Sequence, residues 1–409
     1  MLMIVFTLFR KSYIILSEIG DMKSSSYLKE RNVFIMAKKS DPIVDFAEIR
    51  EKLDNLGSNY RKPVQVIDKD GNIVNQAAFD SFTDEQLVDF MKKMVWERAL
   101  HEQTITFSKQ GRLGFYAPTS GEEASEMGSV SAFEPKDFLW PAYRDLPQLI
   151  QHGSTIEKGY LWSRGHVLGN LYDENYRNWM PQIIIGAQYV EAAGAALGLK
   201  KNGENNVAFV YTGDGGTSQG DTYEGLNFAS AFQAPLVAFV QNNKYAISVP
   251  REKQTAATTL AQKAVAMGVP SVQVDGMDVL AVYLVAKAAR EYAVNGNGPV
   301  LIETLTYRYG AHSSAGDDPK RYRTKEEEDE WHKVDPLIRL RKILIEKGLW
   351  SDEQESEYAD QVKKECKEAL KKADKEYKQT TIEQLQNTFE VPTPNIKEQI
   401  AELEAKESK

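Results

Sequence analysis

VAFVYTGDGG (residues 207–216) and VAFVQNNKY (residues 237–245) are the two stretches that decide the fold. Each begins with an apolar run of the length expected for a buried strand and ends in small or polar residues. A segment with helical character, residues 220–232, separates them. A strand, a helix and a second strand in this order form a right-handed crossover, which places both strands parallel in one sheet.

The alternation of strands and helices continues along the chain. We predict strands at residues 207–211, 236–241, 272–274 and 300–305, and helices at residues 220–232, 258–267 and 278–294. Helices that connect parallel strands cover both faces of the sheet. The pattern therefore predicts an α/β fold with a mostly parallel sheet.

A helix at residues 182–200 is predicted just before the first of these strands. It is unusually rich in small residues, and four residues recur at every fourth position: Gly186, Val190, Gly194 and Gly198. A stripe without bulk allows another helix to approach closely. We interpret it as a packing surface or a subunit contact.

The regions that flank this core differ in character. A helix is predicted from a Thr83 cap to about residue 111, and residues 114–180 are predicted to be rich in loops. Charged helices follow near the C-terminus, one opening at Asp335-Pro336 and one spanning residues 351–371. A short terminal helix is expected after the proline-containing break at residues 391–394.

The chain divides into four parts. In residues 1–35 an apolar run of nine residues precedes the basic residues, the reverse of a secretory signal and too short to cross a bilayer. We interpret them as a leader outside the fold. Residues 36–80 form an N-terminal extension with a small hairpin, residues 81–325 the α/β domain, and residues 326–409 a charged helical arm.

Composition narrows the class of protein. The 409 residues are 42% hydrophobic and 27% charged, as in ordinary globular proteins. The net charge of −9 argues against a surface that coats nucleic acid. Cys366 is the only cysteine, so an internal disulfide framework and a multi-cysteine zinc site are excluded. We expect a reducing, cytoplasmic compartment and no membrane or nucleic-acid partner.

Asp214 and Asn243 follow the ends of the two strands that open this section. The crossover brings them to the carboxyl edge of the sheet, where α/β folds place their ligands. The glycines beside Asp214 allow a bulky anion to approach the backbone, and the next helix begins with free N–H groups. Carboxylate, amide and carbonyl oxygens suit Mg²⁺. The sequence therefore predicts a site for a metal ion and a diphosphate.

The Gly213-Asp214-Gly215 to Asn242-Asn243 pattern resembles the thiamine diphosphate motif. The surrounding sequence resembles the alpha subunits of the decarboxylating components of 2-oxo acid dehydrogenase complexes, most closely the pyruvate dehydrogenase type of Gram-positive bacteria. The resemblance runs from about residue 41 to residue 409 and does not cover residues 1–35. It includes the segments at residues 143–145, 163–167, 181–188, 274–278 and 307–313.

This resemblance implies thiamine diphosphate and Mg²⁺ as cofactors, bound in the thiamine diphosphate-binding fold. It implies that Asp214 and Asn243 bind Mg²⁺ through their side chains and that Tyr245 binds it through its backbone carbonyl. The residues implied to hold the diphosphate are Tyr143, Arg144, Gly215 and Gly216.

Two isoleucines are implied to contact the coenzyme itself. Ile183 and Ile185 match the contacting stretch, and Ile185 matches the hydrophobic prop that holds the coenzyme in its bent form. A branched side chain between the two rings of the coenzyme brings the exocyclic amine against the reactive carbon.

Histidines provide the candidate proton-transfer groups. His312 lies in a glycine-containing polar segment just beyond a predicted strand, and imidazole exchanges protons near neutral pH. The resemblance implies that His312 is the loop histidine near the diphosphate and the incoming lipoyl group, and that His166 is a second active-site histidine. His101, His152 and His332 lie in no motif and are expected to be structural or exposed.

A second α/β unit that would supply the acid for the aminopyrimidine ring was not found in the sequence. The resemblance therefore implies a beta subunit in an α₂β₂ heterotetramer, and a dihydrolipoyl acetyltransferase that accepts the acyl group. The expected activity is that of pyruvate dehydrogenase (acetyl-transferring), with no turnover by this chain alone.

The substrate is open to a second interpretation. Phe115-Tyr116 is more similar to the branched-chain type, and Ala117 stands where eukaryotic pyruvate-type subunits carry histidine. A branched-chain 2-oxo acid or acetoin dehydrogenase alpha subunit is the alternative within the fold. A non-catalytic scaffold that binds Mg²⁺ and a diphosphate is the alternative from another class.

Overall fold

A six-stranded sheet lies at the centre of the computed structural model, which describes residues 62–407. The predicted leader, residues 1–35, lies outside the described residues. The strand order is β2-β1-β3-β4-β8-β7, and every neighbouring pair is parallel. This arrangement confirms the predicted parallel sheet. The strands are β1 (Phe138–Trp140), β2 (Arg177–Asn178), β3 (Ala208–Gly213), β4 (Leu236–Asn242), β7 (Ser271–Asp275) and β8 (Val300–Leu305), while β5 (Tyr245–Ala246) and β6 (Val249–Pro250) form a separate antiparallel pair.

Helices precede, connect and follow these strands. The α-helices are α3 (Gln76–Phe79), α4 (Asp84–Lys109), α5 (Glu123–Val130), α6 (Leu146–Gln151), α7 (Ile156–Ser163), α8 (Gln188–Lys201), α9 (Gly220–Ala231), α10 (Arg251–Gln254), α11 (Val279–Tyr292), α12 (Lys325–His332), α13 (Pro336–Glu346), α14 (Asp352–Ala373), α15 (Thr381–Gln386) and α16 (Pro394–Glu407). Short 3₁₀ turns are η3 (Val167–Asn170), η4 (Asp214–Ser218), η5 (Ala261–Met267) and η7 (Pro319–Arg321), and η6 (Ala293–Asn297) is a π-turn. Within residues 62–407 no helix combines the length and apolar character needed to cross a bilayer.

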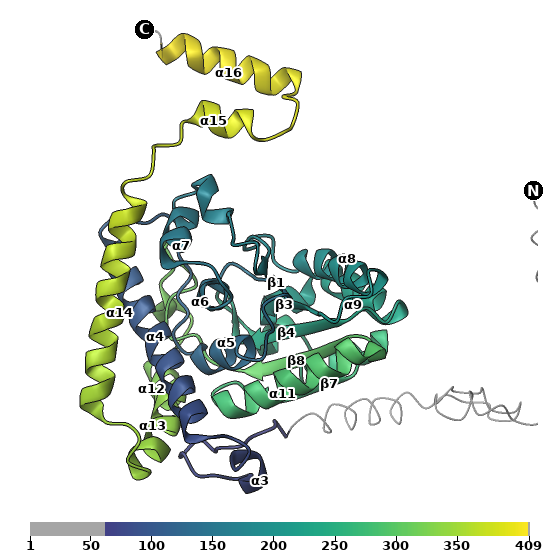
Figure 1. Cartoon of the computed structure of the whole chain (residues 1–409), viewed down its shortest axis with the longest axis vertical. Coiled ribbons are helices and arrows are strands. Elements are labelled where there is room, and N and C mark those ends of the chain that lie inside the picture. Colours follow the sequence, from purple (N-terminus) through teal and green to yellow (C-terminus); the bar gives the residue numbers. More distant parts are fainter. Residues whose placement is uncertain (1–61, 408–409) are drawn as a thin grey trace, which may run out of the picture. The chain divides into compact units, whose positions relative to one another are not determined.

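Both faces of the sheet are covered, as predicted. Along β3 the side chains alternate: Phe209 and Tyr211 belong to a core with residues of α4, α5 and α11. Ala208 and Val210 belong to a second core with residues of α8 and α9. Figure 1 shows α11 along one face of the sheet and α8 and α9 on the other. Two apolar layers therefore hold the strand ends in place.

The predicted crossover between β3 and β4 is confirmed. The two strands are direct neighbours, and their register places Gly213 opposite Gln241. Residues just beyond each strand therefore emerge at the same edge of the sheet.

The helix predicted at residues 182–200 begins only at Gln188. Its first predicted turn is instead irregular, because Gln182 forms a parallel bridge with Ala142 and Gly186 adopts a φ of +99°. A left-handed residue ends regular helix, and glycine adopts this conformation with little strain. The apolar run before Gly186 is a loop.

The predicted helix at residues 258–267 was wrong in type. Residues 261–267 form the 3₁₀ turn η5. Ala261 and Ala264 are both buried on one side of it, and a spacing of three matches the three-residue period of a 3₁₀ turn.

Residues 114–180 contain more regular structure than the loop-rich prediction. They include α5, α6, α7 and β1. All eight residues of α5 are buried, although four of them are polar: Glu123, Ser125, Glu126 and Ser129. The helix therefore has no solvent-exposed face, and its sequence lacks the amphipathic period that reveals a surface helix. The error follows from that missing period.

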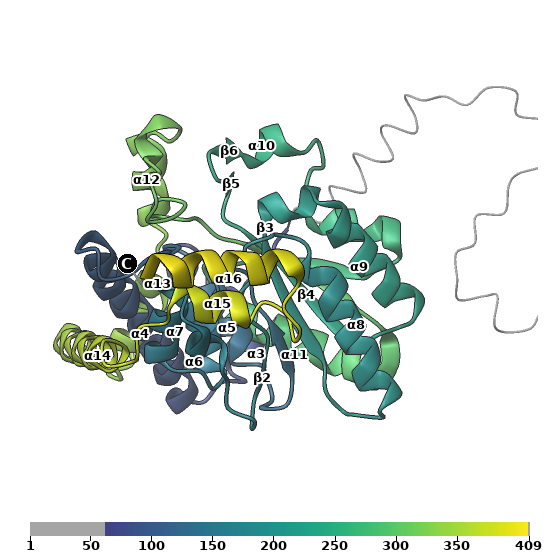
Figure 2. The ribbon, with the colours of Figure 1, turned by 90° about the horizontal axis from the view of Figure 1, so that it is seen from above.

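The flanking segments match their predictions more closely. Thr83 caps α4 with a complete capping box, and Ile67 pairs with Ile73 in the small N-terminal hairpin. Helix α14 begins after Ser351, whose side chain accepts from the N–H of Gln354. Figures 1 and 2 show α14 beside α4. Helix α15 is an addition to the predicted terminal helix.

Candidate active site

A cavity of about 510 Å³ opens at the carboxyl ends of the sheet strands. The segments that follow β1, β3, β4 and β8 line it, together with the loop before α8 and the residues just before α5. Of the candidate site residues, those that line it are Tyr143, Arg144, Ile183, Ile185, Asp214, Gly215, Gly216, Asn243, Tyr245 and His312. The structure therefore brings together all but one of the residues singled out from the sequence.

Asp214 directly follows β3 and is almost completely buried. Its Oδ2 has no hydrogen-bond partner within the described residues. Burial raises the pKa of this carboxyl to about 6, while the charges of Arg308 and Lys244 act in the opposite direction. A buried carboxylate oxygen without a partner is costly unless a cation or a donor meets it, so the site fits a bound cation.

Asn243 directly follows β4 and Tyr245 begins β5, with a sharp turn between them. Lys244 between them adopts a φ of +77°, a left-handed conformation that is uncommon for a residue with a side chain. The N–H of Tyr245 donates to Oδ1 of Asn243 at 3.3 Å. The carbonyl of Tyr245 accepts from Arg308 at 3.1 Å and keeps a second lone pair.

These oxygens form the candidate metal site. Within residues 62–407 no group of three or more His, Cys, Asp or Glu side chains is arranged to hold a metal ion. A cation in the cavity would therefore depend on one carboxylate together with amide and carbonyl oxygens. That mixture suits Mg²⁺, which keeps open positions for phosphate oxygens and water.

Gly215 and Gly216 lie in the η4 turn between β3 and α9. A Cβ atom at position 216 would lie 1.9 Å from Oγ1 of Thr212, so only glycine fits there. At position 215 a Cβ atom would come within 3.0 Å of Ala246. Both glycines line the cavity, so a ligand there can approach the backbone of the turn closely, which suits a diphosphate.

Arg144 and His312 meet across the cavity. Nη2 of Arg144 donates to the carbonyl of His312 at 3.2 Å and lies 3.4 Å from its Nδ1. The Tyr143 ring packs edge-on against the imidazole. Burial, reinforced by Arg144 and Arg308, lowers the pKa of His312 to about 4. The imidazole is therefore neutral at pH 7 and able to accept a proton.

Ile183 and Ile185 reach the cavity from the loop that replaces the first turn of the predicted helix. Ile183 is 57% exposed. Ile185 is half-buried and contacts the glycine turn, since its Cγ1 lies 3.2 Å from the position of a Cβ atom at Gly216. The loop therefore presents branched apolar side chains beside the diphosphate cradle.

His166 is the candidate that the structure does not bring to the cavity. Its Nε2 lies 3.1 Å from the carbonyl of Tyr377, and the two rings pack edge-on. His101 and His152 are buried and hydrogen bonded, and His332 is exposed at the end of α12, as their lack of a motif indicated.

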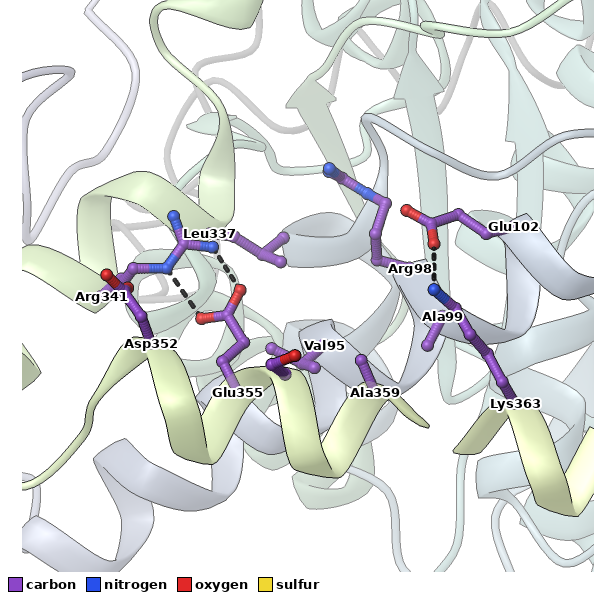
Figure 3. A pocket seen from close by; sticks show the side chains of 11 residues that line it. Val95, Arg98, Ala99, Glu102, Leu337, Arg341, Asp352, Glu355, Ala359 and Lys363 are labelled. Carbon is purple, nitrogen blue, oxygen red and sulfur yellow. Dashed lines mark hydrogen bonds and ion pairs between the residues drawn. The ribbon is translucent and has the colours of Figure 1, made fainter. Parts of the chain in front are cut away.

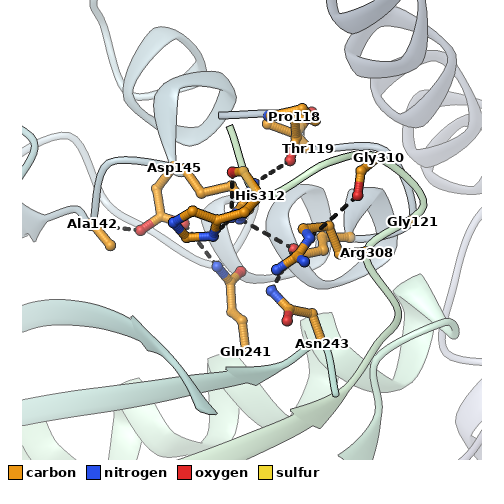
Figure 4. A network of polar contacts seen from close by, with 12 residues as sticks. Pro118, Thr119, Gly121, Ala142, Asp145, Gln241, Asn243, Arg308, Gly310 and His312 are labelled. Atoms are coloured by element: carbon orange, nitrogen blue, oxygen red, sulfur yellow. Dashed lines mark hydrogen bonds and ion pairs between the residues drawn. The ribbon is translucent and has the colours of Figure 1, made fainter. Parts of the chain in front are cut away.

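Several residues that form the cavity were missed in the sequence. Glu122 and Arg308 are fully buried and line it. Gln241 and Asp145 also line the cavity, and Gln241 donates to Asp145 at 2.7 Å. Figure 4 shows Gln241, Asn243, Arg308 and His312 converging on one polar network. The sequence offered no signal for Glu122, because a glutamate in a loop is expected to be exposed.

A second cavity of about 390 Å³ lies between α4, α13 and α14 (Figure 3). Its charged residues pair across the helices: Arg341 donates to Glu355 at 2.7 Å, and Lys363 lies 2.8 Å from Glu102. These ion pairs connect α14 to α13 and α4. This cavity is a gap between packed helices, and its charged side chains hold the helices together.

The model of the family described as dehydrogenase E1 component matches residues 91–382. The chain belongs to the dehydrogenase E1 component family. Every residue that lines the large cavity falls within the matched region.

Two relatives illustrate how far the similarity extends. The protein named pyruvate dehydrogenase E1 component subunit alpha from Staphylococcus epidermidis is 55% identical over 346 residues, which cover 85% of this chain and 94% of the relative. The protein of the same name from Staphylococcus aureus is 54% identical over the same shares of both chains. This E1 component chain is thus similar to the named alpha subunits over almost their full length.

Proposed function

We propose that this chain is the alpha subunit of pyruvate dehydrogenase (acetyl-transferring). In this function it decarboxylates pyruvate and transfers the acetyl group to the lipoyl group of dihydrolipoyl acetyltransferase. The observation that carries the proposal is the cavity at the carboxyl edge of the sheet, which gathers an unpartnered carboxylate, an amide, two arginines and a neutral imidazole. The names of the staphylococcal relatives support it.

The cofactors in this proposal are thiamine diphosphate and Mg²⁺. Asp214, Asn243 and the carbonyl of Tyr245 would hold the metal ion. The residues that would hold the diphosphate are Tyr143, Arg144, Gly215 and Gly216, and Ile183 and Ile185 would contact the coenzyme rings. The free Oδ2 of Asp214 and the glycine turn beside it support this assignment.

When bound, thiamine diphosphate supplies the nucleophilic carbon and the electron sink for decarboxylation. The chain's own residues bind and orient it. Arg144 and Arg308 bring positive charge to the diphosphate end, and Ile185 supports the bent form. His312, which is neutral at pH 7, would take and return a proton near the acyl group. His166 is the second proposed histidine, although its ring lies against Tyr377 in the single chain.

The proposal includes partner subunits. The relatives are named as alpha subunits of an E1 component, and the described residues contain one sheet of the size needed for a coenzyme site. A beta subunit would complete each site in an α₂β₂ heterotetramer, and dihydrolipoyl acetyltransferase would accept the product. A cytoplasmic location is part of the same proposal, and the lone, buried thiol of Cys366 agrees with a reducing compartment.

An activity assay distinguishes pyruvate from a branched-chain 2-oxo acid as the substrate. Phe115 lines the cavity and packs edge-on against Tyr143 and Trp162, whereas Ala117 is buried outside the lining. The names of the staphylococcal relatives favour pyruvate. The assay uses this chain co-purified with its beta subunit, thiamine diphosphate, Mg²⁺ and an artificial electron acceptor. We expect a higher kcat/KM for pyruvate than for 3-methyl-2-oxobutanoate.

Each other outcome of this assay has a clear meaning. Preference for 3-methyl-2-oxobutanoate or for acetoin would replace the substrate and keep the family chemistry. A folded, coenzyme-loaded complex without turnover of any of these compounds would favour the scaffold function.

Asp214→Ala tests the metal site directly. Removing the only cavity carboxylate assigned to the cation should abolish Mg²⁺-dependent binding of thiamine diphosphate, measured by titration calorimetry on the assembled complex. The control is the same titration with EDTA, in which wild-type and variant proteins should behave alike. Unchanged coenzyme affinity in the variant would refute the proposed clamp.

A further inference from the structure

Glu122 occupies an unusual position for an acidic residue. It directly precedes α5, yet its side chain does not cap that helix. The side chain is fully buried and lines the large cavity. It comes from none of the strands that precede the proposed metal ligands, since it lies just before α5.

Its contacts connect two groups of the proposed cofactor site. Oε1 of Glu122 accepts a hydrogen bond from Nδ2 of Asn243 at 2.9 Å. The same oxygen lies 3.5 Å from Nε of Arg144. Its Oε2 has no partner within the described residues. Glu122 is thus the acceptor that the nitrogen end of the Asn243 amide faces.

The direction of this hydrogen bond has a consequence for Asn243. The two ends of an asparagine amide are almost identical in shape and opposite in hydrogen bonding, so the neighbours decide which end faces where. The amide group donates from Nδ2 to Glu122, which directs Oδ1 toward the N–H of Tyr245. Oδ1 is the atom that a cation needs.

We propose that Glu122 is a positioning residue that holds the amide of Asn243 with its oxygen toward the Mg²⁺ ion. This inference deepens the proposed function and rests on it. Residues behind the metal ligands commonly orient them, and their loss weakens metal binding by about 10- to 100-fold. Because Glu122 comes from the segment before α5, it connects that segment to the metal site.

A neighbouring acid shows that burial alone does not create this contact. Glu126 lies one helical turn further along and is equally buried. It does not line the cavity, and its carboxyl interacts with Glu97 instead of Asn243. Glu126→Gln is therefore the matched control, because it removes an equally buried carboxyl without touching Asn243.

The test measures the Mg²⁺ dependence of thiamine diphosphate binding in the complex with the beta subunit, by titration calorimetry at several Mg²⁺ concentrations. Glu122→Ala should raise the Mg²⁺ concentration needed for half-maximal binding by about 10- to 100-fold, and excess Mg²⁺ should restore binding. Glu122→Gln keeps an oxygen that can accept from Asn243, so it should raise that Mg²⁺ concentration by less than about tenfold. Glu126→Gln should match the wild type.

A double-mutant cycle keeps the proposal testable even if Glu122→Ala does not assemble. Asn243→Asp retains an oxygen for the metal but places two carboxyl groups face to face. In that background Glu122→Gln restores a donor opposite an acceptor and should recover Mg²⁺ affinity. Glu122→Gln should thus increase Mg²⁺ affinity in the Asn243→Asp protein but not in the wild type. A purely structural role of Glu122 would not produce this dependence on residue 243.

Three results would overturn the proposal. They are an unchanged Mg²⁺ dependence in Glu122→Ala, an equal loss in Glu122→Gln and Glu122→Ala, and an additive cycle with Asn243→Asp. The second would mean that the charge of Glu122 matters and the orientation of the amide does not. Asp214→Ala separates these failures from a failure of the proposed function, since it should abolish Mg²⁺-dependent binding whatever Glu122 does.

Discussion

Burial disfavours the charged forms of the cavity side chains, so it raises the pKa values of the acids and lowers that of the histidine. It raises the pKa of Glu122 and that of Asp145 to about 7, and it lowers that of His312 to about 4. The acids are partly neutral at pH 7 and the imidazole is uncharged. Arg144 and Arg308 keep their positive charges beside these acids, which gives the cavity cationic groups that a diphosphate can contact.

At the residue scale, His312→Gln separates chemistry from binding. Glutamine retains polar contacts with Arg144 but cannot exchange a proton. We expect turnover of the assembled complex to fall about 10²- to 10⁴-fold, while its affinity for thiamine diphosphate changes by less than about tenfold. Steady-state turnover and calorimetric titration measure the two effects.

His166→Gln in the same assays tests the second histidine. Because that ring contacts Tyr377 and not the cavity, we expect this variant to keep most of its turnover. A large loss here, or unchanged turnover in His312→Gln, would reverse the assignment of the two histidines.

His101 gives a prediction about stability that does not depend on function. Burial and the charges of Arg98 and Arg144 lower its pKa to about 3, against 6.5 in the unfolded chain. Between these two values the unfolded chain binds the proton more strongly, so the group costs stability as the pH falls below about 6.5. His101→Gln removes this loss.

The measurement is the melting temperature of wild-type and His101→Gln protein from pH 7.5 to pH 5. As the pH falls, the melting temperature of the wild type should decrease more than that of the variant. A constant difference across this range would mean that His101 titrates normally in the folded chain.

At the element scale, α8 is fixed to the sheet by side chains that reach the strands. Gln188 donates to the carbonyl of Tyr211 in β3 at 2.7 Å, and the hydroxyl of Tyr189 donates to that of Phe239 in β4 at 2.7 Å. The neighbouring helix α9 approaches closely at Gly225, where a Cβ atom would lie 2.6 Å from the backbone of Tyr189. The two helices therefore form one rigid layer behind the glycine turn.

Gly225→Ala tests this close approach. The added methyl group would force α9 away from α8, and we expect a loss of about 1–3 kcal/mol in the free energy of unfolding. Chemical denaturation of the purified protein measures it. Gly198→Ala on α8 is the control, since no atom lies within 4 Å of its Cβ position and alanine favours helix. Equal stability in both variants would show that the layer can relax.

At the scale of the whole molecule, the stripe on α8 bears on assembly. Neither Gly194 nor Gly198 has an atom within 4 Å of its Cβ position, and Val190 is 44% exposed. No other described part of the chain covers these positions. Gly186, the first residue of the predicted stripe, lies before α8, and a Cβ atom there would come within 2.7 Å of Gln219. Packing within the described chain therefore accounts for Gly186 but not for Gly194 and Gly198, and the predicted subunit contact stays a prediction.

Gly194→Leu tests the subunit contact. The leucine meets open space in the single chain, so its melting temperature should change by only a few degrees. Formation of the complex with the beta subunit should weaken, as measured by size-exclusion chromatography with light scattering. Normal assembly of the variant would place the interface elsewhere.

The sequence alone was sufficient to predict the parallel sheet and the motif formed by Asp214 and Asn243 at its edge. Apolar runs and intervening helices predicted the parallel order of β3 and β4, because right-handed crossovers leave few alternatives. The adjacency of Asp214 and Asn243 followed from the same rule. Residues 182–187 were misjudged because they contain a left-handed glycine, and α5 was misjudged because it buries its polar residues together with its apolar ones.

Only the tertiary structure decided what surrounds the motif. Glu122 contacts Asn243 across 121 residues of sequence, and Arg308 reaches the carbonyl of Tyr245 across 63. Periodicity records how a segment relates to its own neighbours in sequence, and it carries no information about which distant side chain meets which. The motif was therefore readable from the chain itself, whereas its partners depend on how loops from separate elements pack over one edge of the sheet.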